Sequence, residues 1–467
     1  MSLDRARLSV KFYLDRLRAQ TAQLDAQDYP SDHPGPRKWL ALVHGLLDTA
    51  DGYLRSSQAH TASRATKEVR DAADLASQAY RCLVLMQGAG LDELPYPIVG
   101  PLQAWFTELA VQTDTVFRAE LLANYELRPV PDIPFKGIRR PSRTLSRAIS
   151  NIDWPIWTII VPAKALGIST HFAIVAHELG HVLFTRLTWD LNPVAVELDQ
   201  LKQNVAARLG KVAIDPGLFE FLSNVFQDWF QELASDAFAL LLTGPAFFFS
   251  LGDFFQLGPG GYGTSKTHPA HDLRRRVLHG RLSEGGETSY AAVFQKHTGS
   301  ALTDDFNSPL IWKVSSANDI LTYARSLIGR GGKPVYTDDQ AHVLAELHDF
   351  MPRVVPLIFE YVHTYLQDHA PDMIYTVDKY DSDLAAHMQP MLLAIPPIES
   401  GVNLTERQAA AFASILNVGW AVLLTKLDDL QVGVGEDPLR AKRLETLHDL
   451  LLKAVELSEA RKAWGSV

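Results

Sequence analysis

Two histidines and a glutamate interrupt the otherwise apolar segment FAIVAHELGHVLF, and they constrain the fold more than any other feature of the chain. Small and apolar residues recur at helical spacing over about residues 169–188, which predicts a buried helix. Buried histidine and glutamate side chains are costly unless they have partners. The sequence therefore predicts that His177, Glu178 and His181 belong to a buried site, where a bound group interacts with these polar side chains and offsets the cost of burying them.

The spacing of these residues matches the HExxH pattern, for which the partner is a zinc ion. His177 and His181 are four residues apart, so on a helix both imidazoles project from one face and can bind one Zn²⁺. Glu178 lies about 100° further round the helix, where it can reach a metal-bound water without being a ligand. We therefore predict His177 and His181 as metal ligands and Glu178 as the general base.

A catalytic zinc site needs a third protein ligand and one open position. The best candidate is Glu232, which lies with Asp236 on a second strongly apolar helical pattern, about residues 216–243. The two carboxylates are four residues apart and share a face among aromatic and leucine residues, whereas an ordinary acidic pair of this spacing faces solvent. We predict Glu232 as the third ligand and Asp236 as the acceptor of an N–H from a ligating imidazole.

The HExxH segment at 177–181, followed by the ExxxD segment at 232–236, resembles the gluzincin zinc metallopeptidases. The segment THPAHDLR at 267–274 is similar to the T-H-P-x4-R segment that follows the glutamate helix in the CaaX-prenyl and heat-shock endopeptidase family. The three motifs occur in that family's order, and the resemblance covers about residues 157–280. It implies that the glutamate helix gives the third zinc ligand and that its aspartate orients the first histidine.

The same resemblance implies that His268 and Arg274 lie near the active site, where a cationic or hydrogen-bonding side chain can stabilise an oxyanion. The alternative is that His268 and Pro269 begin a helix whose Arg274 pairs with an acidic neighbour. Members of the family are commonly membrane-embedded. Here even the most apolar stretch, 237–255, is interrupted by glycine, proline and polar residues, so no transmembrane segment is predicted and we expect a soluble relative.

Helical periodicity covers most of the chain and predicts a mainly α-helical protein. An N-terminal helical region, 1–126, ends with a helical pattern at about 99–124, and a C-terminal helical region, 291–467, follows the motifs. Between them, residues 127–290 contain the run WTIIVP, which predicts a strand at 157–162. The expected fold class is therefore a multi-helix protein with a zincin-like α+β core, in which a small edge β-sheet lines the substrate cleft.

The charge balance and the cysteine count limit the partners and the compartment. The chain has 467 residues and a formal net charge of −10, which argues against nucleic acid as a partner. Its single cysteine, Cys82, cannot form an intrachain disulfide, and the N-terminal residues show no apolar signal sequence. We therefore expect a cytoplasmic location.

These observations predict a zinc-dependent endopeptidase that acts on a protein or peptide substrate, with flanking helical regions that restrict access to the cleft. The alternative is a zinc-stabilised sensor or interaction scaffold without turnover. A structural zinc site is usually closed by four ligands and needs no base. No fourth Cys or His stands at ligand spacing, and Glu178 is suited to act as a base, so the sequence favours the enzyme.

Overall fold

A computed structural model divides the chain into two compact units, Met1–Gly167 and Ile168–Val467. This division differs from the three predicted regions, because residues 127–167 belong to the first unit and residues 291–467 to the unit of the motifs. The structure describes residues 3–26, 35–86, 100–102, 104–105, 108–109, 115–120, 126–130, 141–151, 156–162, 169–185, 189, 195–257, 263–304, 306, 313–314, 316–329, 331–400, 408–432 and 440–465.

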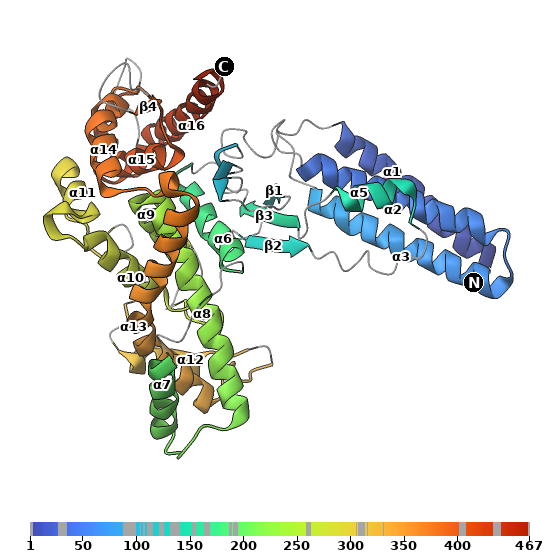
Figure 1. Cartoon of the computed structure of the whole chain (residues 1–467), viewed down its shortest axis with the longest axis horizontal. Helices are drawn as coiled ribbons and strands as arrows, with labels where there is room; N and C mark the ends of the chain where they lie inside the picture. Colours follow the sequence, from blue (N-terminus) through green and yellow to red (C-terminus); the bar gives the residue numbers. More distant parts are fainter. Residues whose placement is uncertain are drawn as a thin grey trace. The chain divides into compact units, whose positions relative to one another are not determined.

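Three long helices lie side by side in the first unit (Figure 1). They are α1 (Leu3–Asp25), α2 (Gly35–Ser57) and α3 (Ala62–Met86), and their inward faces form one apolar core. The shorter α5 (Arg143–Ser150) packs against α2. Gly45 permits this contact, because a Cβ atom there would lie 2.5 Å from Cα of Leu145.

A three-stranded sheet also belongs to the first unit. Its strands are β1 (Thr115–Glu120), β2 (Glu126–Val130) and β3 (Ile156–Pro162), in the order β1-β3-β2. Strand β3 is parallel to β1 and antiparallel to β2. The predicted helix over 99–124 is therefore wrong at Thr115–Glu120, where the sequence TVF favours a strand through its β-branched and aromatic residues.

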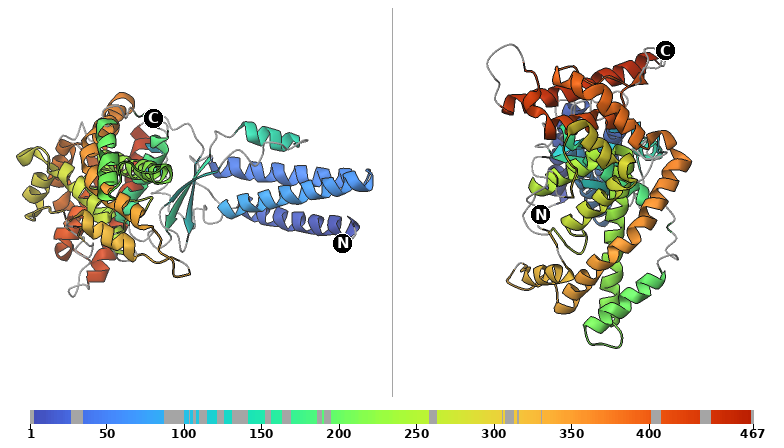
Figure 2. Two further views of the ribbon diagram at one scale, coloured as in Figure 1. Left: turned by 90° about the horizontal axis from the view of Figure 1, so that it is seen from below. Right: turned by 90° about the vertical axis from the view of Figure 1, so that its left-hand side faces the viewer.

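Helices build the second unit, and α8 and α13 run along each other through it (Figures 1 and 2). The α-helices are α6 (Ala173–Phe184), α7 (Ala195–Arg208), α8 (Pro216–Thr243), α9 (Pro245–Leu257), α10 (His271–Ser283), α11 (Tyr290–Thr298), α12 (Ala317–Ser326), α13 (Asp338–His369), α14 (Val377–Leu392), α15 (Phe412–Thr425) and α16 (Arg440–Gly465). Short 3₁₀ turns lie at Ser169–Phe172, Gly286–Thr288, Pro371–Met373 and Leu427–Asp429.

The mainly α-helical character is confirmed, but the predicted α+β core with its small edge sheet is wrong. Among its described residues the second unit has only the two-residue strands β4 (Glu399–Ser400) and β5 (Gln408–Ala409) and one isolated bridge. The run WTIIVP precedes the motif helix in sequence, yet its strand pairs with β1 and β2 of the first unit.

The long helix α8 is well specified by its own sequence. Asp215 caps its N-terminus by accepting the N–H of Leu218 at 2.9 Å, and Pro216 occupies the first turn. Gly244 ends it with φ of 59°, a conformation that favours glycine. Asn417 of α15 then accepts the N–H of Ala246 at 2.8 Å, which fixes the start of α9. Helix α8 is thus long and largely buried, and it carries Glu232 and Asp236 of the candidate site.

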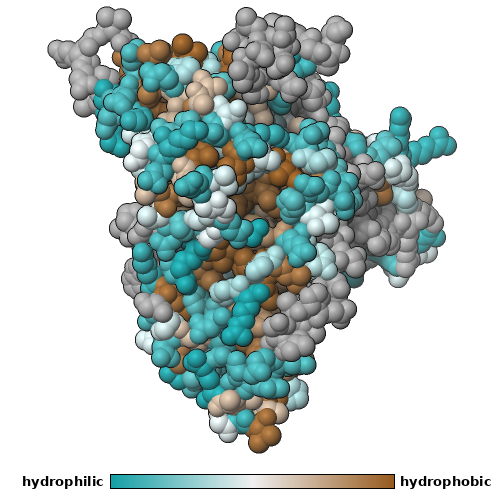
Figure 3. All heavy atoms as spheres, turned by 60° about the vertical axis from the view of Figure 1, so that its left-hand side comes forward, coloured by the Kyte–Doolittle hydropathy of each residue, from teal (hydrophilic) through white to brown (hydrophobic). Residues whose placement is uncertain are grey.

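Hydrophilic side chains cover most of the face drawn in Figure 3, and apolar atoms show mainly in hollows between them. None of the helices in the described residues combines the length and the apolar character that crossing a membrane requires.

Candidate metal centre

A close contact between α6 and α8 brings the motif residues together. Gly180 of α6 lies against Ser235 of α8, where a Cβ atom at position 180 would be 2.6 Å from Cα of Ser235. Only glycine allows the two backbones to approach this closely. The two helices therefore meet along the face that carries His177 and His181 on one side and Glu232 on the other.

The potential ligand atoms converge on one point. Nε2 of His177 lies 3.5 Å from Oε2 of Glu232, and Nε2 of His181 lies 3.4 Å from Oε1 of the same carboxylate. One ligand atom from each of the three residues lies within 4.8 Å of the other two. Oε2 of Glu232 is buried, and Nη1 of Arg274 is an ion-pair partner 3.2 Å from it that does not meet hydrogen-bond geometry. Two imidazole nitrogens and a carboxylate oxygen form a donor set that suits Zn²⁺, so the residues fit the predicted ion.

Two side chains of α8 hold the histidines from behind. Oδ1 of Asp236 lies 2.9 Å from Nδ1 of His177, and Oγ of Ser235 lies 3.1 Å from Nδ1 of His181. Because Nδ1 of each ring is engaged, Nε2 is the atom directed toward Glu232. The contact of Asp236 is the one its spacing from Glu232 predicts. Ser235 was missed, although its position three residues after Glu232 places it on the same helix face.

Arg274 of α10 lies beneath the site and pairs with two of its carboxylates. Its Nε and Nη2 lie 2.7 and 2.5 Å from the two oxygens of Asp236, and its Nη1 lies 3.2 Å from Oε2 of Glu232. The side chain is 4% exposed, so a substrate cannot reach it directly. Of the two sequence interpretations, the structure shows the pair with acidic neighbours. We therefore regard Arg274 as a positioning residue.

Burial and these pairs set the charges of the site. Burial lowers the pKa of His181 to about 4, so its ring is neutral at pH 7. Burial also lowers the pKa of His177, but the interactions of its ring N–H groups with the Asp236 and Glu232 carboxylates outweigh burial and raise the pKa to about 9. The pKa values of Glu232 and Asp236 are lowered despite burial, because His177 and Arg274 stabilise their anions. The two carboxylates are balanced by His177 and Arg274, so a bound metal ion would have to displace the proton of His177.

Glu178 and His268 complete the predicted set. The Glu178 side chain is buried and directly follows His177 in sequence. Burial opposes the charge of Arg274, but Asp236, Glu232 and Glu178 together raise its pKa. Nε2 of His268 lies 3.4 Å from Oε1 of Glu232, and its Nδ1 lies 2.8 Å from Oγ1 of Thr267. The His268 side chain is 51% exposed, so it lies on the open side of the site, opposite in character to the buried Arg274.

No protein-family model matches this chain, and no curated protein or solved structure is significantly similar to it. The chemistry of the site is therefore the basis for the function proposed below.

Proposed function

We propose that this protein is a zinc-dependent endopeptidase that hydrolyses peptide bonds of a protein or peptide substrate. The observation that carries the proposal is the convergence of Nε2 of His177, Nε2 of His181 and the Glu232 carboxylate at one buried point, with Glu178 on the same helix. A cytoplasmic location is part of the same proposal, and the lone Cys82 supports it.

His177, His181 and Glu232 would hold the ion, and Asp236 and Ser235 would keep both imidazoles in the ligating orientation. When bound, the zinc would polarise a substrate carbonyl and acidify a water molecule. The Glu178 carboxylate would take the proton of that water and pass it to the leaving amine nitrogen. His268 would donate a hydrogen bond to the carbonyl oxygen of the substrate, because its ring is on the exposed side of Glu232.

The test distinguishes the role of Glu178 as general base from the role of His177 as metal ligand. Glu178→Gln keeps the size of the side chain and removes the base, so zinc content and thermal stability should stay near wild type. Cleavage of a peptide library, read by mass spectrometry, should fall by a factor of about 10²–10⁴. His177→Ala should lose both zinc and cleavage, because a ligand is removed.

Two results would contradict the proposal. One is a Glu178→Gln variant that cleaves as well as wild type. The other is a zinc-loaded wild-type protein that cleaves no peptide of the library, which would favour the zinc-stabilised sensor or scaffold.

A further inference from the structure

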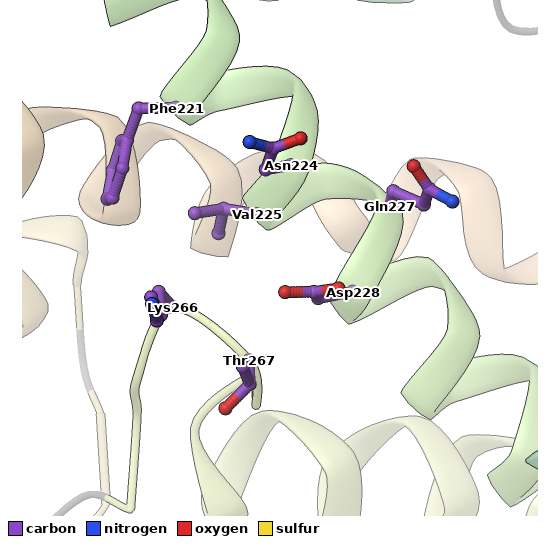
Figure 4. A pocket seen from close by; sticks show the side chains of 7 residues that line it. All are labelled: Phe221, Asn224, Val225, Gln227, Asp228, Lys266 and Thr267. Atoms are coloured by element: carbon purple, nitrogen blue, oxygen red, sulfur yellow. The ribbon is translucent and has the colours of Figure 1, made fainter. Parts of the chain in front are cut away.

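A pocket of about 390 Å³ lies between α8 and the loop that precedes α10 (Figure 4). One wall is the first half of α8 and the other is the loop that leads into α10. The lining residues are Phe221, Asn224, Val225, Gln227 and Asp228 from α8, and Lys266 and Thr267 from the loop.

Both walls lead directly to residues of the site. Asp228 is four residues before Glu232 on α8, which corresponds to one helical turn and about 6 Å along the axis. Thr267 immediately precedes His268, whose Nε2 lies 3.4 Å from Oε1 of Glu232. A peptide bound at the metal centre would therefore present one of its side chains to this pocket.

Asp228 and Lys266 are the two charged groups that line the pocket, and Asp228 is the more buried of the two. It is half-buried, and within the described residues no hydrogen bond or ion pair reaches its carboxylate. Burial and the nearby Glu232 raise its pKa, against the opposing effect of His268 and Lys266. Lys266 is exposed, so its charge is solvated by water, whereas Asp228 gains more from a partner that enters the pocket.

The remaining lining suits a long basic side chain. Val225 is buried and Phe221 is half-buried, and together they offer an apolar wall for a methylene stem. The side chain of Asp228 points across the pocket toward the loop in Figure 4, where the charged end of such a stem would meet it.

We propose that this pocket binds a lysine or arginine side chain of the substrate and that Asp228 determines this specificity. The inference rests on the proposed function, because it treats the neighbouring metal centre as the place where the peptide lies.

The test measures binding, so that it does not depend on catalysis. The zinc-loaded, full-length Glu178→Gln protein is titrated with degenerate eight-residue peptide pools in which one position, scanned along the peptide, is arginine, citrulline or glutamate. Citrulline keeps the shape of arginine and lacks its charge. We expect arginine at one position to strengthen binding about tenfold over citrulline, which is typical of a hydrogen bond between charged groups.

Variants at two acidic residues of α8 show whether the preference for arginine depends on Asp228. Asp228→Asn, made in the same protein, should abolish the preference for arginine, and Asp228→Lys should reverse it toward glutamate. Glu220→Gln is the matched control, because Glu220 is an exposed carboxylate on the same helix outside the pocket, and it should leave the preference unchanged.

Each outcome decides the inference. Equal binding of the arginine and citrulline pools at every position, or a preference that survives Asp228→Asn, overturns it. A preference for glutamate in the Glu178→Gln protein also overturns it and would assign the pocket to Lys266. An Asp228-dependent arginine preference in a protein that cleaves no peptide would uphold the pocket and refute the peptidase.

Discussion

The close contact between Gly180 and Ser235 requires glycine at position 180, because there is no room for a Cβ atom. An alanine Cβ there would lie 2.6 Å from Cα of Ser235 and 3.0 Å from both its Cβ and its carbonyl oxygen. Two of these three atoms belong to the backbone of α8, so no side-chain rotation relieves the contact. Gly180→Ala should therefore push α6 away from α8.

The expected magnitude follows from two opposing effects. Alanine is favoured over glycine inside a helix by about 1 kcal/mol. Overpacking a well-packed core costs about 1–3 kcal/mol, and a clash with backbone belongs at the upper end. The net expectation is a loss of about 2 kcal/mol in the free energy of unfolding, together with weaker zinc binding because His177 and His181 move away from Glu232.

The matched control is Gly280→Ala on α10. A Cβ atom at Gly280 would meet nothing within 4 Å, so only the helix preference acts and the protein should gain up to about 1 kcal/mol. Urea unfolding gives the stabilities, and competition with a chelator gives the zinc affinities. If Gly180→Ala is as stable as Gly280→Ala and binds zinc like wild type, the helices are not in close contact and the reasoning is refuted.

Two further predictions concern the residues behind the ligands. Asp236→Ala should lower zinc affinity by about 10–100-fold, because His177 loses the acceptor at its Nδ1; an unchanged zinc titration would remove Asp236 from the site. Arg274→Met should cost about 3–5 kcal/mol in the metal-free protein, since two ionised carboxylates stay buried without their cation, and zinc should restore part of that loss by neutralising Glu232. Urea unfolding with and without zinc would measure it, and equal destabilisation in both states would contradict this explanation.

The site residues could be predicted from the sequence because the spacing of residues along a helix determines the direction in which their side chains project. Two four-residue spacings, in the histidine pair and in the acidic pair, each place two side chains on one face. Apolar surroundings add that both faces are buried. The sequence could not tell that Gly180 allows a backbone contact or that Ser235 reaches His181, because both depend on which helices pack together and at what distance.

The errors in the predicted fold also come from contacts between segments that are distant in sequence. The β-branched and aromatic residues of WTIIVP predict the strand that forms at Ile156–Pro162, but no local pattern shows that its partners are β1 and β2 of the first unit. Thr115–Glu120 lies inside a stretch with apolar residues at helical spacing, and the hydrogen bonds to β3 decide its conformation. Strand pairing depends on residues distant in sequence. Sequence patterns therefore predict it poorly where the apolar residues fit both the helical and the strand periodicity.

That the N-terminal and C-terminal helical regions restrict access to the cleft stays a prediction, and the contacts of the C-terminal region show a structural role as well. Helix α13 packs along α8, and Phe350 of α13 lies 6.1 Å from Phe226 between ring centroids. The backbone N–H of Tyr375 donates to the carbonyl of Leu241 at 2.8 Å. These contacts support helix α8, which carries Glu232 and Asp236, so the region helps to keep the ligand face rigid. A site whose ligands come from two helices needs this support, because a small shift of either helix separates its donors.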